Sequence, residues 1–508
     1  DRMSKITKQD VVDWANKYLG PESYAIIYKR EGKDPDEQKI AAPKITPIVT
    51  NRDSQSEFLS EIQTSQVQPI EPVFVDYKKD MSQFEAQPGI DVLYKKNETN
   101  DIFTLIYVFN TGTENDPALN LAFNYLSYLG TDKMTAEEIA SEMYDIACSF
   151  YMNAGANQSS IQITGLSENM GKAMEIVEGL IAGAKPDEAI LENLKGDMLK
   201  SRADAKLNQS RCFGALQRYL FYGGDFIRRT TLTDPALQAL TSEQLLAKIG
   251  GLMGKQHEVL YYGPQKEAEV KSALAKHHKV AADLQPLEKK FSTLLPTDAN
   301  KVVLAQYDAK QLYYLQFSNR GEKFDVAADP EITLYNEYFG GGMNTIVFQE
   351  MREARGLAYT AWATLATPSN ANGDYSYYAF IATQNDKMQK AVEAFDDIIN
   401  NMPESEKAFG IAKEALVSRL RTERTVKDGV LWSYLRARDL GLDAPRDKQI
   451  FEKVQSMTLD DVKAAQQKWV KGRKYVYGIL GDIQNLDLNY LKTLGPIQTV
   501  SQEEIFGY

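Results

Sequence analysis

Residues 240–264 read LTSEQLLAKIGGLMGKQHEVLYYGP, and residues 457–482 read MTLDDVKAAQQKWVKGRKYVYGILGD. In both stretches a threonine can cap a short amphipathic helix, which a turn separates from a strand. Residues 6–32, ITKQDVVDWANKYLGPESYAIIYKREG, show the same order, with AIIY as the predicted strand. Three copies of one helix–turn–strand ending indicate that a larger unit has been duplicated.

The segments between these endings also repeat. SENMGKAMEIVEGLI aligns with QNDKMQKAVEAFDDII, so that Met170 matches Met388. Nearly the same separation divides Thr241 from Thr458 in the two endings. Units of this length are duplicated domains rather than solenoid repeats. We therefore expect two homologous modules, preceded by the tail of another.

Within the last module, strands and helices are segregated in runs. Two hydrophobic stretches, AYTAWATLAT and DYSYYAFIAT, are separated by a loop in which Asn372-Gly373 is a strong hairpin signal. Further strands are predicted at KVVLAQY and QLYYLQFS, and helices near ITLYNEYFGGG, over 386–401 and over 404–424. Hairpins beside packed helices predict an α+β fold in which each module has a mostly antiparallel β-sheet.

The segment 33–78 is rich in Pro, Gln and Ser and has weak periodicity, which is typical of a linker. The chain begins with DRMSKITKQD, which is neither an initiator methionine nor a signal peptide, so we expect a processed or excised piece. The expected organisation is a module tail at 1–32, a linker at 33–78, one module at 79–290 and another at 291–508.

Composition excludes several classes of function. The net charge of −12 argues against a nucleic-acid partner, and no apolar run reaches the ~18–20 residues of a membrane span. Cys148 and Cys212 both lie in helical patterns, and we expect them to pack as small apolar groups rather than to form a bridge. The redox compartment stays open.

The stretch MREARGLAY, residues 351–359, places Arg352 and Tyr359 on either side of a helix–strand junction. Arg352 is predicted in the last turn of a helix that Gly356 ends in the left-handed conformation, and Tyr359 at the first position of the next strand. Taken alone, the pair is a surface arginine and a sheet aromatic. A phenol and a guanidinium held at one junction also suit an oxyanion and a neighbouring carbonyl.

The duplicated modules and the stretch GGGMNTIVFQEMREARGLAY resemble the pitrilysin/insulinase family of zinc metallopeptidases. The resemblance covers essentially the whole chain. It implies four α+β modules in two halves, which close like a clamshell around a peptide. This chain then corresponds to the end of the second module, the linker and the third and fourth modules. The resemblance further implies that Arg352 and Tyr359 are catalytic and substrate-binding residues that reach the active site of the first module.

The family's metal motif, His-x-x-Glu-His, is missing from this chain. Leu121, Asn124 and Tyr125 in LAFNY stand where its two histidines and glutamate would be, shortly before Gly130-Thr131. None of the three offers an imidazole or a carboxylate, so we expect no zinc in this module. The three histidines of the chain, His257, His277 and His278, have no metal-ligand spacing and are predicted not to be ligands.

The sequence therefore predicts the carboxyl-terminal half of a zinc metalloendopeptidase, inactive alone and completed by an amino-terminal half that holds the zinc. Peptides are the expected substrates. Two alternatives stay open: a non-catalytic structural subunit, and a peptide-binding half without a catalytic partner. The resemblance also suggests the periplasm or cell envelope as the location.

Overall fold

The computed structural model describes residues 2–28, 32, 56–66 and 68–508. They form two compact units, Asp1–Pro69 and Ile70–Tyr508. The smaller unit contains helix α1 (Lys8–Tyr18), a 3₁₀ turn at Met3–Lys5 and helix α2 (Glu57–Thr64). A capping box begins α1, because the Thr7 side chain accepts from the Asp10 N–H at 3.2 Å and Asp10 accepts from the Thr7 N–H at 2.8 Å.

One prediction for this region is wrong. AIIY, residues 25–28, forms no strand, and Ile27 is 90% exposed. The described residues of the smaller unit form no strand with which residues 25–28 could pair, and a strand without a partner leaves its backbone groups unbonded. Helix α2 and the first two residues of helix α3 (Tyr77–Asp80) lie within the segment that is predicted to be a linker. Residues 33–55 of that linker lie outside the described part of the chain.

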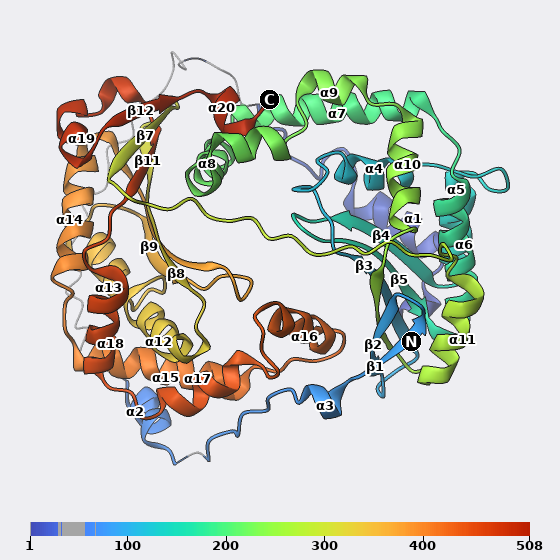
Figure 1. The fold of residues 1–508 in the computed structure, drawn as a ribbon, viewed down its shortest axis with the longest axis horizontal. Coiled ribbons are helices and arrows are strands. Elements are labelled where there is room, and N and C mark those ends of the chain that lie inside the picture. The colour runs from blue at the N-terminus through green and yellow to red at the C-terminus, as the bar shows by residue number, and fades with distance from the viewer. Residues whose placement is uncertain (1, 29–31, 33–55, 67) are drawn as a thin grey trace. The chain divides into compact units, whose positions relative to one another are not determined.

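The larger unit contains two six-stranded sheets (Figure 1). The first has the strand order β1-β2-β6-β3-β5-β4, and the second has the order β12-β7-β11-β8-β10-β9. The strands of the first sheet are β1 (Ser82–Gln87), β2 (Ile90–Lys96), β3 (Ile102–Phe109), β4 (Cys148–Ala154), β5 (Ser159–Leu166) and β6 (His257–Gly263). Those of the second are β7 (Lys301–Gln306), β8 (Gln311–Lys323), β9 (Thr360–Ala366), β10 (Asp374–Gln384), β11 (Val476–Gly481) and β12 (Ile497–Val500).

Five strands of each sheet follow the same order, from β2 to β4 in one and from β7 to β9 in the other. The sixth strand differs, because β1 pairs antiparallel to β2 whereas β12 pairs parallel to β7. The β2–β6 and β7–β11 pairs are parallel, and the remaining pairs are antiparallel. The predicted α+β fold with mostly antiparallel sheets is confirmed.

The repeated ending explains why the two sheets agree. Capping boxes at Thr241 and Thr458 begin helices α10 and α18, and the strands that follow, β6 and β11, are buried along their whole length. Both strands lie inside their sheets, each between one parallel and one antiparallel neighbour. Each ending therefore supplies an interior strand of its sheet.

Helices follow the strands in both halves of this unit. Those associated with the first sheet in sequence are α4 (Leu119–Leu126), α5 (Ala136–Asp145), α6 (Met170–Gly183), α7 (Glu188–Lys206), α8 (Gln209–Thr230), α9 (Asp234–Ala239), α10 (Ser242–Leu252) and α11 (Glu267–His277). Those associated with the second are α12 (Asp329–Phe339), α13 (Ile346–Phe348), α14 (Met388–Asn400), α15 (Glu406–Thr422), α16 (Gly429–Asp439), α17 (Arg446–Val454), α18 (Leu459–Ala465), α19 (Leu488–Leu494) and α20 (Gln502–Phe506). Two π-helical segments, Gln349–Ala354 and Gln466–Val470, and 3₁₀ turns at Ser167–Asn169, Val326–Ala328, Asn385–Lys387 and Ile483–Asn485 complete the fold.

Each sheet has one face covered by helices of its own half and the other face covered by a helix from the opposite half. Leu216 and Leu220 of α8 pack on the second sheet, against Phe317 and Leu480. Gly478 of β11 allows this approach, because a Cβ there would collide with Leu220.

The reverse contact covers the first sheet. Leu431 and Leu435 of α16 pack on the strands that carry Ile106 and Leu260. At the edge of this contact, Nη2 of Arg438 donates to Oε2 of Glu258 on β6 at 2.7 Å. The two sheets are therefore joined by two reciprocal helix contacts.

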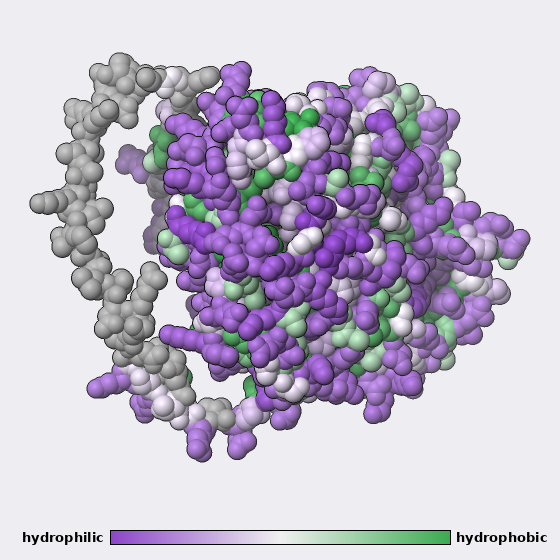
Figure 2. All heavy atoms as spheres, turned by 60° about the vertical axis from the view of Figure 1, so that its left-hand side comes forward, coloured by the Kyte–Doolittle hydropathy of each residue, from purple (hydrophilic) through white to green (hydrophobic). Residues whose placement is uncertain are grey.

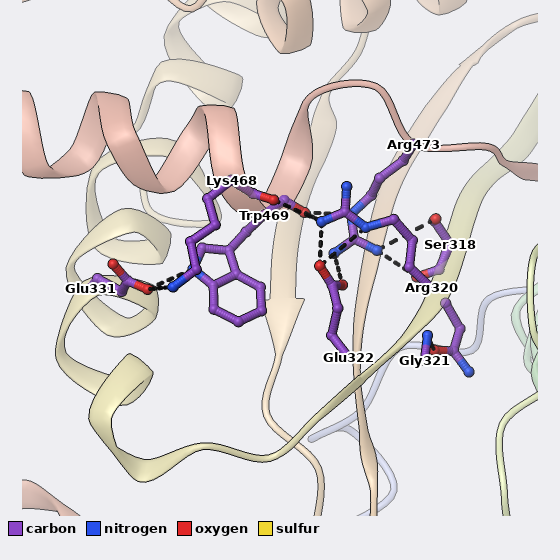
Figure 3. Close-up of polar contacts among 9 residues, drawn as sticks. Ser318, Arg320, Gly321, Glu322, Glu331, Lys468, Trp469 and Arg473 are labelled. Atoms are coloured by element: carbon purple, nitrogen blue, oxygen red, sulfur yellow. Dashed lines mark hydrogen bonds and ion pairs between the residues drawn. The ribbon is translucent and has the colours of Figure 1, made fainter.

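A polar network ties the end of the helical layer to the second sheet (Figure 3). The buried Arg473 donates to Glu322 of β8 at 2.7 Å, and Arg320 donates to the Lys468 carbonyl at the same distance. Nε1 of Trp469 donates to Glu331 of α12, also at 2.7 Å. Burial lowers the pKa of Arg473, and the Glu322 carboxylate offsets part of that cost.

The two cysteines are free and buried, and burial raises the pKa of both thiols. Cys212 lies in α8 as predicted, but the helical prediction for Cys148 is wrong, because Cys148 begins β4. Helix α5 ends at Asp145, and the φ of 50° at Ala147 prevents the helix from continuing to Cys148.

The surface drawn in Figure 2 is mostly hydrophilic, with small hydrophobic areas between polar side chains. Among the helices of the described residues, none has the length and apolar character needed to cross a membrane.

In the core between the second sheet and its own helices, the carboxyl of Asp396 lies near several tyrosines. The rings of Tyr314 and Tyr477 lie 6.2 Å apart, and burial raises the pKa of both, with the carboxyl of Asp396 on α14 adding to the shift. Burial in turn raises the pKa of Asp396 to about 6, and the charge of Glu393 adds to the shift. An ionised Asp396 therefore destabilises the folded chain.

We predict that Asp396→Asn stabilises the chain at pH 7–8 by roughly 1–2 kcal/mol, allowing for the partial exposure of this side chain. A raised pKa means that the stability contributed by Asp396 is complete below about pH 4 and is lost as the pH rises through about 6. Urea unfolding of both proteins from pH 4 to 8 measures this difference, which should vanish at the acid end. Asp397→Asn is the matched control: Arg355 lowers the pKa of Asp397, so its loss should give no stabilisation at pH 7.

Candidate active-site pair on a helix–strand junction

The junction that carries Arg352 and Tyr359 differs in detail from the prediction. Arg352 lies in the π-helical segment Gln349–Ala354 rather than in an α-helix, and Gly356 ends that segment with φ 57° as predicted. The strand β9 begins at Thr360, so Tyr359 precedes it by one residue instead of opening it. A π-helical turn shifts its side chains relative to a regular helix, and such turns are frequent at functional sites.

Leu357 attaches the junction to the sheet. Leu357 is buried in the helical core, and its N–H donates to the Met351 carbonyl at 2.9 Å. Its own carbonyl accepts from the Thr383 hydroxyl of β10 at 2.6 Å. Leu357 therefore anchors the turn between Arg352 and Tyr359.

A second arginine clamps the other side of the turn. Arg355 donates to Asp397 at 2.7 Å and to Glu350 at 3.3 Å, and the hydrogen bond to Asp397 is the main cause of its raised pKa. Arg355 is thus committed to structural partners, which leaves Arg352 as the arginine that faces Tyr359.

Helix α12 holds the strand that follows. Asn336 donates to the Leu365 carbonyl and accepts from the Leu365 N–H, both at 2.9 Å, which satisfies backbone groups of the edge strand β9. Gly340, at the end of α12, touches the same strand, because a Cβ there would collide with the Ala363 carbonyl. The first glycine of the stretch GGGMN is therefore needed for close packing of α12 on β9.

Arg352 and Tyr359 lie in contact. The guanidinium carbon of Arg352 is 4.4 Å from the centre of the Tyr359 ring and 4.9 Å from that of Phe348, so that it is close to two aromatic rings. Its Nε is 3.5 Å from Oε1 of Glu353. The Tyr359 side chain is 74% exposed, whereas that of Arg352 is 33% exposed.

Sequence reasoning missed Phe348 and Glu353 as neighbours of Arg352. The spacing of four residues between Phe348 and Arg352 is the signal that could have found the first contact. Beyond the junction, Ala361 packs in the helical core, whereas Trp362 packs on the face that α8 covers. The two side chains therefore lie on opposite faces of the sheet.

The pair offers hydrogen-bond donors but neither a base nor a nucleophile. A guanidinium stacked on a ring keeps its in-plane N–H groups available, and the exposed phenol can donate its O–H. Such an arrangement can bind and stabilise an oxygen that gains negative charge, but it cannot by itself activate water.

The place of the metal motif is part of the hydrophobic core. Leu121 and Tyr125 of α4 are buried, and Asn124 is exposed. The Tyr125 hydroxyl donates to the Ser242 hydroxyl of α10 and accepts from the Asp187 N–H, both at 2.7 Å. Three side chains without an imidazole or carboxylate do not fit zinc, and no cluster of three or more potential metal-binding side chains occurs among the described residues.

Two of the histidines are buried together. His278 is 1% exposed and is hydrogen-bonded to His257, which is 4% exposed. Neither sequence spacing nor helical periodicity brings two histidines together when one begins a strand and the other follows a helix.

Comparisons with known proteins agree with this fold. Residues 256–416 match the family described as the peptidase M16 inactive domain. An uncharacterized zinc protease of Streptomyces coelicolor is 22% identical over 266 residues, which are 49% of this chain and 56% of that protein. The chain therefore spans little more than half the length of this relative.

Two solved structures share the architecture. The peptidase M16 inactive domain from Pseudomonas fluorescens has a TM-score of 0.62 at 18% identity, covering 79% of this chain and 98% of its own. The periplasmic protease PqqL from Escherichia coli has a TM-score of 0.59 at 13% identity, covering 95% of this chain and 51% of its own. These findings support the resemblance to the pitrilysin/insulinase family: residues 256–416 match the inactive domain of peptidase M16, and about half of the chain is similar to a zinc protease.

Proposed function

We propose that this chain acts as the carboxyl-terminal half of a clamshell zinc metalloendopeptidase. Residues 79–290 and 291–508 would be its third and fourth modules, 1–32 the tail of a second module, and 33–78 the linker between the halves. The common order of five strands in the two sheets supports the two modules. That the chain covers 51% of PqqL supports a protease of two halves.

The stacked pair Arg352–Tyr359 is the observation that carries this proposal. Arg355 is held by the carboxylates of Asp397 and Glu350 on either side of the turn, whereas Arg352 contacts the carboxylate of its own neighbour Glu353 at 3.5 Å. The guanidinium carbon of Arg352 lies 4.4 Å from the centre of the Tyr359 ring, and Tyr359 is largely exposed. We assign both residues to a peptide substrate.

The proposed chemistry follows from the donors. As a peptide carbonyl becomes tetrahedral, its oxygen gains negative charge, and the Tyr359 O–H donates a hydrogen bond that strengthens with that charge. The guanidinium of Arg352 binds a neighbouring carbonyl and orients the peptide. Contact with the Tyr359 and Phe348 rings limits the motion of the guanidinium before the substrate arrives.

The family implies zinc, but the residues of α4 do not fit it. We therefore assign the metal to an amino-terminal half, either in the same precursor or in a partner chain. PqqL is named a periplasmic protease, and we propose the periplasm or cell envelope as the location of this protein too.

The purified chain should contain no stoichiometric zinc and cleave no peptides, because Leu121, Asn124 and Tyr125 supply no ligands. Elemental analysis and a peptide-cleavage assay on the same sample test this prediction. A control sample mixed with the amino-terminal half should gain both metal and activity. One zinc per chain, removable by a chelator and required for cleavage, would refute the assignment.

In the assembled protease, Tyr359→Phe should lower kcat by roughly 10²–10³ with a much smaller change in KM, since the lost donor acts on charge that develops in the transition state. Arg352→Lys should also impair turnover, because an ammonium lacks the planar fork. Steady-state kinetics on both variants measures these effects, once folding and association of the halves have been verified.

The matched control is Tyr144→Phe, which removes the hydroxyl of another tyrosine that is 82% exposed, on α5 of the proposed third module. Its kinetics should equal those of the wild type. Wild-type turnover in both Tyr359→Phe and Arg352→Lys would instead mean that Arg352 is a surface arginine and Tyr359 a sheet aromatic without a catalytic role.

A further inference from the structure

All three histidines of the 508 residues gather at one place beside the first sheet. His257 begins β6, His277 ends α11 and His278 follows it, while α6 brings Glu175 and Glu178 alongside. Figure 1 shows α6 and α11 next to each other beside this sheet. Segments far apart in sequence thus place titratable groups in one cluster.

Three of these side chains form a continuous hydrogen-bonded chain. Nδ1 of His257 is 2.8 Å from the Lys255 carbonyl, its Nε2 is 2.8 Å from Nε2 of His278, and Nδ1 of His278 is 2.6 Å from Oε1 of Glu178. The exposed fractions of His257, His278 and Glu178 are 4%, 1% and 7%. Water therefore cannot readily replace any of these bonds.

The three hydrogen bonds together require a particular number of protons on His257, His278 and Glu178. The Lys255 carbonyl can only accept, so Nδ1 of His257 carries a proton and its Nε2 is an acceptor. Nε2 of His278 must then donate, and a third proton lies between its Nδ1 and Glu178. Two neutral imidazoles and an ionised carboxylate hold only two protons, which would leave two acceptors facing each other in one contact.

We propose that the chain His257–His278–Glu178 retains this third proton at neutral pH and so forms a proton-dependent anchor for the segment that leads from the first sheet to the second. That segment, residues 278–300, begins at His278. Its first peptide groups depend on the same cluster: Glu178 accepts from the Lys279 N–H at 3.4 Å, and the Gln87 amide donates to the His278 carbonyl at 3.2 Å.

The surrounding groups are consistent with a retained proton. Burial, followed by the charge of His278, lowers the pKa of His257 to about 4, so this ring stays neutral and can accept. Tyr107 of β3 lies against the His278 ring at 4.1 Å, and burial together with the Glu178 charge raises its pKa well above the usual range.

The remaining charges lie toward the outside of the cluster. His277 pairs with Glu175 at 3.2 Å, and the charges of Lys276 and Lys279 act on His277, whose pKa burial lowers. Lys255 contributes its carbonyl to the chain. His277 is therefore a neighbour of the anchor but not a member of it.

The anchor gives stability a definite dependence on pH. In unfolded protein, histidine and glutamate have pKa values of about 6.5 and 4.3, so above about pH 7 these three groups hold two protons. In the folded protein these three groups hold three protons, and one proton is released on unfolding. The unfolding constant therefore rises by up to about tenfold per pH unit. Stability continues to fall with rising pH until the folded protein itself releases the third proton.

Glu178→Gln tests the count directly. The glutamine amide can donate to Nδ1 of a neutral His278, so all three contacts form without a stored proton. Between pH 7 and 9, the unfolding constant of the wild type relative to Glu178→Gln should rise by up to about tenfold per pH unit. His277→Gln, a substitution at the adjacent histidine outside the chain, should follow the wild type over this range.

Nitrogen-15 NMR of the imidazoles in the wild type supplies a second readout that needs no variant. At pH 8 we expect either one ring protonated on both nitrogens or a protonated glutamate carboxyl, together with one ring permanently protonated at Nδ1. Equal pH dependence of stability in the wild type and Glu178→Gln would overturn the proposal. So would three singly protonated rings with every glutamate ionised, which decides the question even where Glu178→Gln fails to fold.

Discussion

Each sheet of this protein has buried apolar side chains on both faces. One of these faces is covered in part by a helix from the other half: α8 packs on the second sheet, with α20 in the same cluster, and α16 packs on the first, with α3 in the same cluster. Burying a leucine side chain contributes roughly 1.5–3 kcal/mol, and each helix brings at least two fully buried leucines to the contact. Neither sheet could keep its present exposure to solvent without the opposite half.

This constraint extends to the Arg352–Tyr359 junction. The strand that follows Tyr359 is the edge of the second sheet, and its Trp362 stacks near Phe380, which in turn contacts Phe213 of α8. Its other face holds Ala361 and Ala363 against the helical core. The position of the junction is therefore set by packing on both faces of the sheet, one of which comes from the other half of the chain.

Much of the fold could be predicted because its signals are local. A capping threonine, a helical stripe and a buried strand are adjacent in residues 240–264 and again in 457–482, and hairpin residues mark the β9–β10 turn. The strand predicted at 25–28 failed because pairing depends on a neighbour that the segment itself does not encode. Cys148 was misplaced because a non-glycine residue, Ala147, adopts a positive φ that no sequence rule anticipates.

The site was predictable only in part. Arg352, Gly356 and Tyr359 carry a recognisable pattern, so their proximity could be inferred. The π-helical turn, the Phe348 contact and the clamp of Arg355 on Asp397 depend on tertiary packing and could not. The same holds for His257 and His278, which approach each other only because α11 returns along the sheet.

The reciprocal position of α8 and α16 has a consequence for how such a protein could arise. A single module of this type, made alone, would carry one helix with no sheet of its own to cover and one sheet face with no helix. Two identical copies would satisfy both needs by domain swapping, in an isologous dimer with twofold symmetry. Fusing the two copies into one chain would then raise their effective concentration and free each to diverge, one towards the exposed arginine–tyrosine pair and the other towards the buried histidine cluster.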